Sequence, residues 1–317
     1  MIFPIEFLEE HGRSFPAWGL DDSRRYTRAL TRAHYENFSV ASMLVPKRLR
    51  QDYCNIYAYC RWADDLGDET GDPAKSLDLL GWWRSELLSM YSGQAIHPVF
   101  VALRDTVVRH GLPPQDFENL LHAFEQDQSI QRYGTYGDLL EYCRFSANPV
   151  GRLVLRVNDC VDEGLFNLSD RICTALQMAN HWQDIRRDWG MDRVYMPIQV
   201  MESNGYSLEM LADDMASGTA SDDCKNTVRE LTERAAALFT SGLPLADRLE
   251  GRLAFEIELF ARAGMAVLEK IRAQGWDTIA HRPTIHRSER VMLLLRVMGR
   301  RMVRVIALET RSQRVPD

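Results

Sequence analysis

This sequence predicts an all-α fold, and three observations lead to that expectation. Helical periodicity recurs along the whole chain, while alternating apolar and polar runs bounded by Asn-Gly or Asp-Gly turns are missing. No segment repeats at a fixed period, which argues against a solenoid or a propeller. The composition is 45% hydrophobic and 26% charged, as expected for an ordinary protein that buries a large core.

The expected helices are separated in many places by proline or glycine, as at Gly111-Leu112-Pro113-Pro114 and at Gly190. In chain order, the helical pattern covers residues 22–34, 47–66, 76–91, 97–110, 114–128, 136–144, 149–162, 168–189, 207–217, 222–246, 250–274 and 287–308. Segment 214–224, DMASGTASDDC, is predicted to be a surface loop.

No Gly/Ser/Pro-rich tract divides the chain, so we predict a single domain over residues 1–317. Its core would cover about 22–285, followed by a basic amphipathic helix at about 287–308.

Charge and cysteine content narrow the class of protein. The formal net charge of −7 argues against a nucleic-acid binder, which normally carries a basic domain. The six cysteines form no CxxC pair, and the first twenty residues lack the basic and apolar regions of a signal peptide. No apolar run approaches the roughly 18 residues of a membrane-spanning helix. We therefore expect reduced thiols and a cytoplasmic protein.

A first acidic cluster, RWADDLGDE, contains Asp64, Asp65 and Asp68 beside Arg61. Residues four apart lie on one face of a helix, so Asp64 and Asp68 project together. Acidic side chains near a helix C-terminus are unfavourable unless a cation offsets their charge. A solvated charge run at a helix end is the alternative interpretation.

A second cluster, NHWQDIRRD, places Asn180, Asp184 and Asp188 at the same four-residue spacing, with Gln177 one turn earlier. An amide and two carboxylates offer the oxygen ligands that Mg²⁺ prefers together with a substrate phosphate. The arginines that follow, among them Arg193, can donate paired hydrogen bonds to phosphate oxygens. Polar residues on an exposed face with arginine partners remain the alternative. His181 is predicted to be a packing residue, directed away from the Asn180–Asp184 face.

Together the two clusters resemble the motifs of the squalene and phytoene synthase family. One motif appears here as Tyr57-Ala58-Tyr59-Cys60-Arg61 followed by Asp64 to Asp68, the other as Gln177 through Asp188 followed by Arg193-Val194-Tyr195. The likeness runs from about His34 to about Pro283. Two further stretches resemble the hydroxysqualene synthases of bacterial hopanoid biosynthesis: residues 34–50, HYENFSVASMLVPKRLR, and residues 142–155, YCRFSANPVGRLVL.

The resemblance implies an isoprenoid-synthase-type helical bundle around a central cavity, and a role for each matched residue. Two or three Mg²⁺ ions would be held by Asp64, Asp65, Asp68, Asn180, Asp184 and Asp188. The diphosphate and its isoprenoid tail would contact Arg61, Arg193, His34 and Phe38. The ionisation site would be lined by Tyr57, Gln177 and Tyr195.

The reaction that this resemblance implies is ionisation of presqualene diphosphate, rearrangement of the carbocation and capture of water to give hydroxysqualene. Condensation of two prenyl diphosphates to presqualene diphosphate, squalene, phytoene or dehydrosqualene is the alternative, and a non-catalytic assembly factor ranks third. The motif reads Asn180-His181-Trp182-Gln183-Asp184, without the arginine of many condensing members, which favours a substrate with one diphosphate.

No GxGxxG loop follows a strand, so a Rossmann dinucleotide site is not indicated, although NADPH could bind in another kind of pocket. NADPH is not expected, since the reaction that the resemblance implies ends with capture of water. Transfer of substrate from an upstream synthase would fit the pathway that the resemblance implies. The basic segment 291–306 has two interpretations: a helix that packs its Leu/Met face on the core, or one that contacts the anionic inner surface of a membrane. Small residues at Ala261–Ala266 either leave room for a lipid tail or allow close helix packing.

Overall fold

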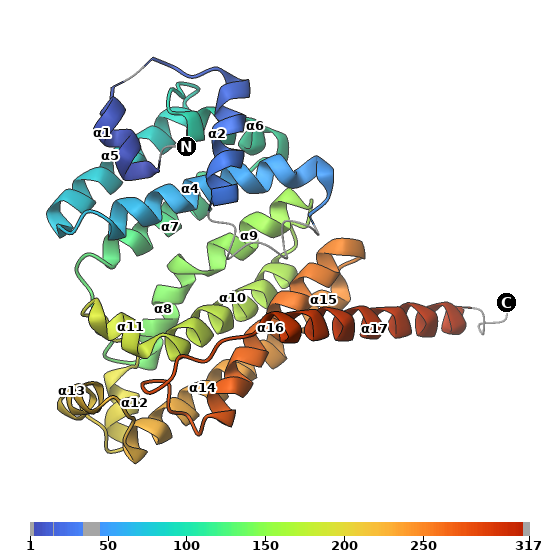
Figure 1. Cartoon of the computed structure of the whole chain (residues 1–317). Helices are drawn as coiled ribbons and strands as arrows, with labels where there is room; N and C mark the ends of the chain where they lie inside the picture. The colour runs from blue at the N-terminus through green and yellow to red at the C-terminus, as the bar shows by residue number, and fades with distance from the viewer. Residues whose placement is uncertain (1–2, 15, 34–44, 313–317) are drawn as a thin grey trace. The chain divides into compact units, whose positions relative to one another are not determined.

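A computed structural model describes residues 3–14, 16–33 and 45–312, with side chains as far as Val303. Over these ranges the chain forms helices joined by turns and bends, without a β-strand, which confirms the all-α prediction (Figure 1). His34 and Phe38 lie outside the described residues. The chain groups into two compact units, Met1–Tyr133 with Gly137–Cys173, and Gly134–Tyr136 with Thr174–Asp317. The expectation of a single domain stays a prediction.

The first unit is built around α4, which carries the first acidic cluster. Its elements are α1 (Pro4–His11), α2 (Leu20–Ala33), the 3-10 turn η1 (Lys47–Leu49), α4 (Arg50–Asp68), α5 (Pro73–Tyr91), α6 (Pro98–His110), α7 (Pro114–Gln126) and α9 (Asn148–Val157), while α8 (Tyr136–Ser146) and α10 (Glu163–Gln183) contribute residues to both units. Helix α5 begins three residues before the predicted start because the Asp72 side chain accepts a hydrogen bond from the Ala74 amide at 2.9 Å.

Aromatic side chains pack α4 against its neighbours. The rings of Trp62 and Trp83 stack with centroids 4.9 Å apart, and both side chains are fully buried. Tyr59 is also buried and donates its hydroxyl to the Phe117 carbonyl at 2.9 Å, which ties α4 to α7. Trp62, Trp83 and Trp182 are fully buried, and Trp82 is partly buried.

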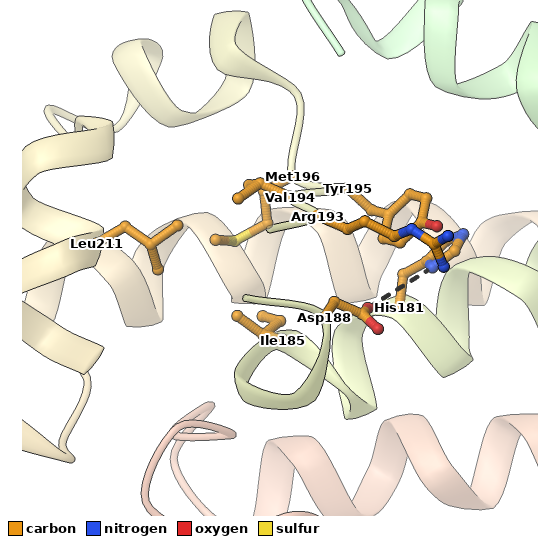
Figure 2. A pocket seen from close by; sticks show the side chains of 8 residues that line it. All are labelled: His181, Ile185, Asp188, Arg193, Val194, Tyr195, Met196 and Leu211. Atoms are coloured by element: carbon orange, nitrogen blue, oxygen red, sulfur yellow. Dashed lines mark ion pairs between the residues drawn. The ribbon is translucent and has the colours of Figure 1, made fainter. Parts of the chain in front are cut away.

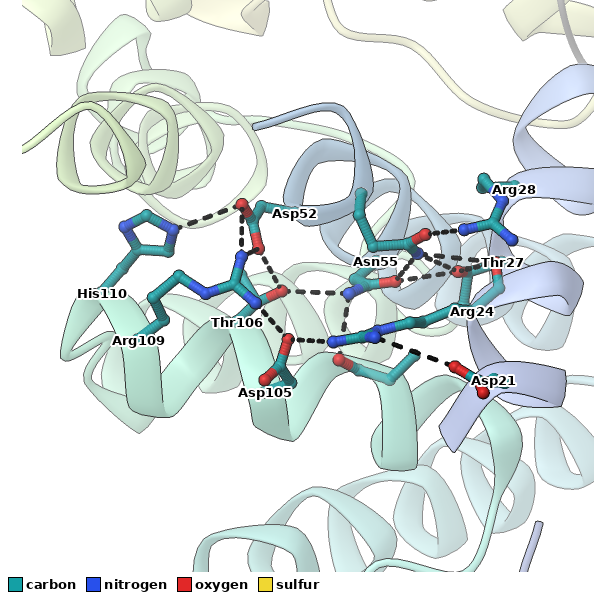
Figure 3. Close-up of polar contacts among 12 residues, drawn as sticks. Asp21, Arg24, Thr27, Arg28, Asp52, Asn55, Asp105, Thr106, Arg109 and His110 are labelled. Carbon is teal, nitrogen blue, oxygen red and sulfur yellow. Dashed lines mark hydrogen bonds and ion pairs between the residues drawn. The ribbon is translucent and has the colours of Figure 1, made fainter. Parts of the chain in front are cut away.

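A buried polar network fixes the position of α4 on α2 and α6 (Figure 3). Asp52 is fully buried, and it accepts hydrogen bonds from Thr106 at 2.8 Å and from Arg109 at 3.2 Å. Asn55 donates to Thr106 at 3.0 Å and accepts from Thr27 at 2.8 Å. Because each partner is specific in position and direction, the network resists sliding of α4 along the other two helices.

The second unit packs its longest helices against one another. They follow in the order α11 (Ile185–Gly190), α12 (Ile198–Ser203), α13 (Leu208–Ser217), α14 (Asp222–Gly242), α15 (Pro244–Arg248), α16 (Gly251–Ala273) and α17 (Arg287–Ser312). Helix α16 contacts α14, α15 and α17. A Cβ on Gly264 of α16 would overlap Cζ of Phe239 and lie 2.8 Å from Cδ2 of Leu176. The small residues at 261–266 therefore allow close helix packing at this point.

The predicted loop at 214–224 is mostly helical. Asp214 lies in α13 and is buried, and α14 already begins at Asp222. The Asp214 carboxylate accepts hydrogen bonds from the Tyr206 hydroxyl at 2.9 Å and from the Ser221 backbone amide at 3.0 Å. These bonds hold the short link between the helices in place, so the polar composition of the segment misled the prediction.

None of the helices in the described part of the chain combines the length and the apolar character needed to cross a membrane. None of the six cysteines, all of which lie within the described residues, forms a disulfide.

Candidate active site

The first acidic cluster occupies the last turns of α4, and Arg61 binds two of its carboxylates. Arg61 Nη1 lies 3.1 Å from Asp64 Oδ2, and Arg61 also pairs with Asp65. Asp65 is buried, and burial raises its pKa to about 6 despite the neighbouring guanidinium. Asp64 and Asp68 reach solvent. Asp64 and Asp68 are thus better placed than Asp65 to ligate a metal ion.

Tyr57 lies one turn before Arg61 on α4 and is half-buried. Burial raises the pKa of its phenol, with a smaller opposing effect from the charge of Arg61. The hydroxyl therefore stays protonated at neutral pH.

The second cluster spans a break between two helices, where the sequence predicts one helix over 168–189. Helix α10 ends at Gln183, and α11 begins at Ile185, with Asp184 between them at φ −109° and ψ 15°. The backbone amide of Asp184 donates to the Asn180 carbonyl at 2.9 Å, and that of Asp188 donates to the Asp184 carbonyl at 2.9 Å. These bonds keep the four-residue spacing across the break.

Asp184 is bound by Arg282, which no sequence motif indicated. Arg282 Nη2 donates to Asp184 Oδ2 at 3.0 Å, and its Nε donates to Oδ1 of the same carboxylate. The residue directly before Asp184 is Gln183 and not an arginine, but the fold brings Arg282 to this carboxylate from 98 positions further along the chain. The number of cationic donors near the second cluster therefore cannot be counted from the motif alone.

Arg282 and Asp184 lie at a pocket of about 540 Å³, part of which is open to solvent. Its other lining residues are Gln183, Arg186, Arg187, Thr278, Ile279 and Ala280. Three guanidinium groups around one opening favour an anion such as a phosphate.

Asp188 faces a second, narrower pocket together with Arg193 and Tyr195 (Figure 2). Burial, and then the charge of Asp184, raise the pKa of Asp188 to about 7. The backbone amide of Arg193 donates to the Asp188 carbonyl at 2.8 Å, which sets the position of the Arg193–Tyr195 segment. Three residues of the predicted site are thus brought together in the second unit.

The ring of His181 also lines this pocket. It stacks on Tyr195 with centroids 3.6 Å apart, and its Nδ1 lies 4.0 Å from Asp188 Oδ2. Burial lowers the pKa of His181 to about 3, so the ring is neutral and the contact with Asp188 is not an ion pair at neutral pH. His181 is a buried packing residue as predicted, but it lies against Asp188 of the ligand set, although the sequence predicted that it points away from the ligand face. It also supports Tyr195, which the sequence did not show.

Gln177 is half-buried on α10, and Asn180 is exposed one turn later. In the described residues, no three His, Cys, Asp or Glu side chains converge on one point as a complete metal cage. Mg²⁺ is commonly held by one or two carboxylates together with substrate phosphate and water, so the donors present fit this ion. A divalent cation bound between Asp184 and Asp188 would offset the electrostatic repulsion between their carboxylates.

Comparison with known proteins identifies the family of this chain. The sequence profile of the squalene/phytoene synthase family matches residues 31–290. Hydroxysqualene synthase from Zymomonas mobilis is 34% identical over 74% of this chain and 78% of its own length. The enzyme of the same name from Sinorhizobium fredii is 31% identical over 82% of this chain and 86% of its own.

A solved structure supports the same family assignment. The crystal structure of squalene synthase HpnC from Alicyclobacillus acidocaldarius is similar with a TM-score of 0.75 and 42% identity, covering 81% of this chain and 95% of that one. Phytoene synthases and a presqualene diphosphate synthase also match, at lower identity. The fold, the two acidic motifs and these matches together establish that the chain belongs to the squalene/phytoene synthase family.

Proposed function

We propose that this protein is an enzyme that converts presqualene diphosphate and water into hydroxysqualene and inorganic diphosphate. The observation that carries the proposal is the second cluster, where two neighbouring carboxylates lie beside the guanidinium groups of Arg282 and Arg193. Such a site attracts a metal ion and a diphosphate at the same time. The hydroxysqualene synthases that match most of the chain support this reaction.

The carboxylates Asp64, Asp68, Asp184 and Asp188, with the amide of Asn180, are the residues we propose to hold Mg²⁺. When bound, the ion supplies Lewis-acid stabilisation of the charge on the departing diphosphate. Arg193 and Arg282 donate hydrogen bonds to the same phosphate oxygens. Arg282 would loosen its contact with Asp184, because a metal ion ligated by this carboxylate competes for the same two oxygens.

Tyr57, Gln177 and Tyr195 are proposed to line the site where the carbon–oxygen bond breaks. Aromatic faces stabilise a nearby carbocation and exclude bulk water until the quenching water is admitted. Tyr195 is suited to this role because His181 stacks on one face of its ring and holds the ring in position. Water captures the cation in this reaction, so NADPH has no part in it.

Head-to-head condensation of two prenyl diphosphates is the second candidate, favoured by the match to a protein named squalene synthase at 42% identity. Incubation of the purified protein with Mg²⁺ and either farnesyl diphosphate or presqualene diphosphate separates the two. We expect hydroxysqualene from presqualene diphosphate, with no change when NADPH is added. Turnover of farnesyl diphosphate alone would refute the proposal.

The apolar substrate and product also lead us to propose that the enzyme acts at a membrane surface, receiving presqualene diphosphate from an upstream synthase there. Exchange through the lipid phase avoids the cost of dissolving a C30 polyene in water.

A further inference from the structure

The C-terminal helix α17 turns a band of apolar side chains toward solvent. Leu295 is 56% exposed and Met302 is 64% exposed. Among the side chains of α17 that the structure describes, the large apolar ones that are exposed are Val291, Met292, Leu295, Met298, Met302 and Val303. In Figure 1 the distal part of α17 projects beyond α16, against which it packs. Exposed apolar side chains that gather on one helix indicate a binding surface, whereas single exposed ones do not.

The orientation of α17 is fixed by what it buries. Val297 is fully buried, and Arg301 points into the second unit. Arg301 donates to Glu258 Oε2 at 2.8 Å and to the carbonyls of Ala246 at 2.6 Å and Ala254 at 2.9 Å. The interpretation in which the Leu/Met face packs on the core holds only in part: Leu293 and Leu294 are partly buried, whereas the other Leu/Met side chains are exposed, and Arg301 is the one arginine of the described side chains of α17 that turns inward. Because these bonds satisfy a buried guanidinium, rotating α17 to hide its apolar band would break all of them.

The exposed residues form a continuous stripe. Positions 291, 295, 298 and 302 are separated by four, three and four residues, which places them one above another on a helix. Met292 and Val303 lie on the same side and widen the stripe. We refer to these six residues as the outer stripe of α17.

Positive charge borders the outer stripe. Arg296 and Arg300 follow one edge, Arg287 lies near the other, and all three are exposed. Between residues 287 and 303 the sequence has arginines at 287, 290, 296, 300 and 301 and a single acid, Glu289, although the chain as a whole is acidic. Glu289 is paired with Lys270 at 2.8 Å. An apolar stripe edged with arginines is the pattern of a helix that lies in a lipid headgroup region, where long basic side chains reach the phosphates.

We propose that the outer stripe of α17 binds the surface of an anionic lipid bilayer, with the helix axis parallel to the membrane. A second copy of the chain is a poorer occupant, because two such stripes in contact would bring their arginine edges together without acids between them. The inference depends only on α17 and stands independently of the reaction proposed above.

Flotation of the full-length protein with lipid vesicles tests the proposal without any substrate. We expect binding to phosphatidylcholine vesicles that contain about 30% phosphatidylglycerol, and little binding to phosphatidylcholine alone. Binding should fall when salt rises from about 0.1 M to about 0.5 M, because the arginine contribution is screened. Equal binding to both kinds of vesicle, or to neither, would overturn the proposal.

Two double variants identify the surface. The first double variant, Leu295→Glu with Met302→Glu, removes the apolar contact. The second, Arg296→Glu with Arg300→Glu, reverses the charge of one edge. Each double variant should weaken vesicle binding at least about tenfold. The matched controls are Val108→Glu on α6, at a residue that is 75% exposed, and Arg144→Glu on α8. Both should bind vesicles as the wild type does. Thermal unfolding checks that all variants fold.

Stripe variants that bind vesicles as well as the controls would refute the assignment to α17. A wild-type dimer that the stripe variants convert to a monomer, with no vesicle binding by either, would show that a second copy of the chain occupies the stripe.

Discussion

Arg282 holds the carboxylate of Asp184 through two hydrogen bonds, one of them 3.0 Å long, across 98 positions of sequence. The guanidinium occupies the oxygens that the proposed metal ion would need. Arginine therefore competes with Mg²⁺ for Asp184 until a diphosphate offers Arg282 another partner.

Removing this competitor should raise the affinity for Mg²⁺. In Arg282→Gln we expect the Mg²⁺ concentration for half-maximal thermal stabilisation to fall about fivefold, the equivalent of about 1 kcal/mol for a partly exposed pair. Turnover should also fall, since the arginine no longer contacts the diphosphate. Arg272→Gln, an exposed arginine on α16, is the control and should change neither quantity. An unchanged Mg²⁺ requirement in Arg282→Gln would contradict the competition.

Replacing the proposed ligands should separate catalysis from stability. Asp64→Asn and Asp184→Asn are each expected to lower turnover about a hundredfold or more, because Lewis-acid stabilisation of the leaving group is worth several kcal/mol. The melting temperature should change little, since repulsion between like charges is relieved as ion pairs are lost. Asp213→Asn, at an exposed acid, is the control. Large thermal losses with activity retained would instead indicate a structural ion network.

Glu256 on α16 should make stability depend on pH. It is buried, its Oε1 has no hydrogen-bond partner among the described residues, and burial raises its pKa to about 7. The folded pKa lies above the unfolded value of about 4.3, so ionisation costs more in the folded protein, and stability falls between about pH 4 and pH 7.

Glu256→Gln removes that cost. The melting temperature of the variant minus that of the wild type should be near zero at pH about 4 and positive by about 2–4 °C at pH about 8. Glu233→Gln, at an exposed position of α14, should show no such trend. A difference that shrinks as the pH rises would be inconsistent with a buried, unpaired carboxyl group.

The buried Asp52 should be essential for the packing of α4. Asp52→Ala removes the acceptor for Thr106 and Arg109, and we expect the free energy of unfolding to fall by about 3–5 kcal/mol, measured by chemical denaturation. Asp78→Ala breaks a surface pair with Arg13 and should leave the free energy of unfolding nearly unchanged, because the pair is exposed to solvent. Equal effects of the two variants would argue against a stabilising role for the network.

Two helical glycines should respond in opposite directions to alanine. Gly264→Ala places a methyl group against Phe239 and Leu176 and should destabilise the protein by about 1–3 kcal/mol. A methyl group on Gly81 of α5 would meet no atom within 4 Å, so Gly81→Ala should stabilise the protein by about 0.5–1 kcal/mol. Chemical denaturation of both variants provides the comparison.

The sequence by itself determined the helical class, most of the helices and the residues that carry the family motifs. These features depend on local spacing: apolar residues three or four apart define a buried helix face, and aspartates four apart share another. The packing role of His181 was predicted from the same spacing. The prediction of a surface loop at 214–224 was wrong, because a polar residue such as Asp214 can be buried in a helix if its neighbours supply hydrogen bonds.

Only the tertiary structure decided which distant groups meet. Arg282 pairs with Asp184, and His181 stacks on Tyr195, through chain contacts that no local pattern encodes. The exposure of Leu295, Met298 and Met302 on α17 was equally hidden, because an amphipathic helix can bury either face until a partner such as Glu258 selects one. Periodicity fixes what lies on a helix face, but the energy of burying that face depends on residues far away in the sequence.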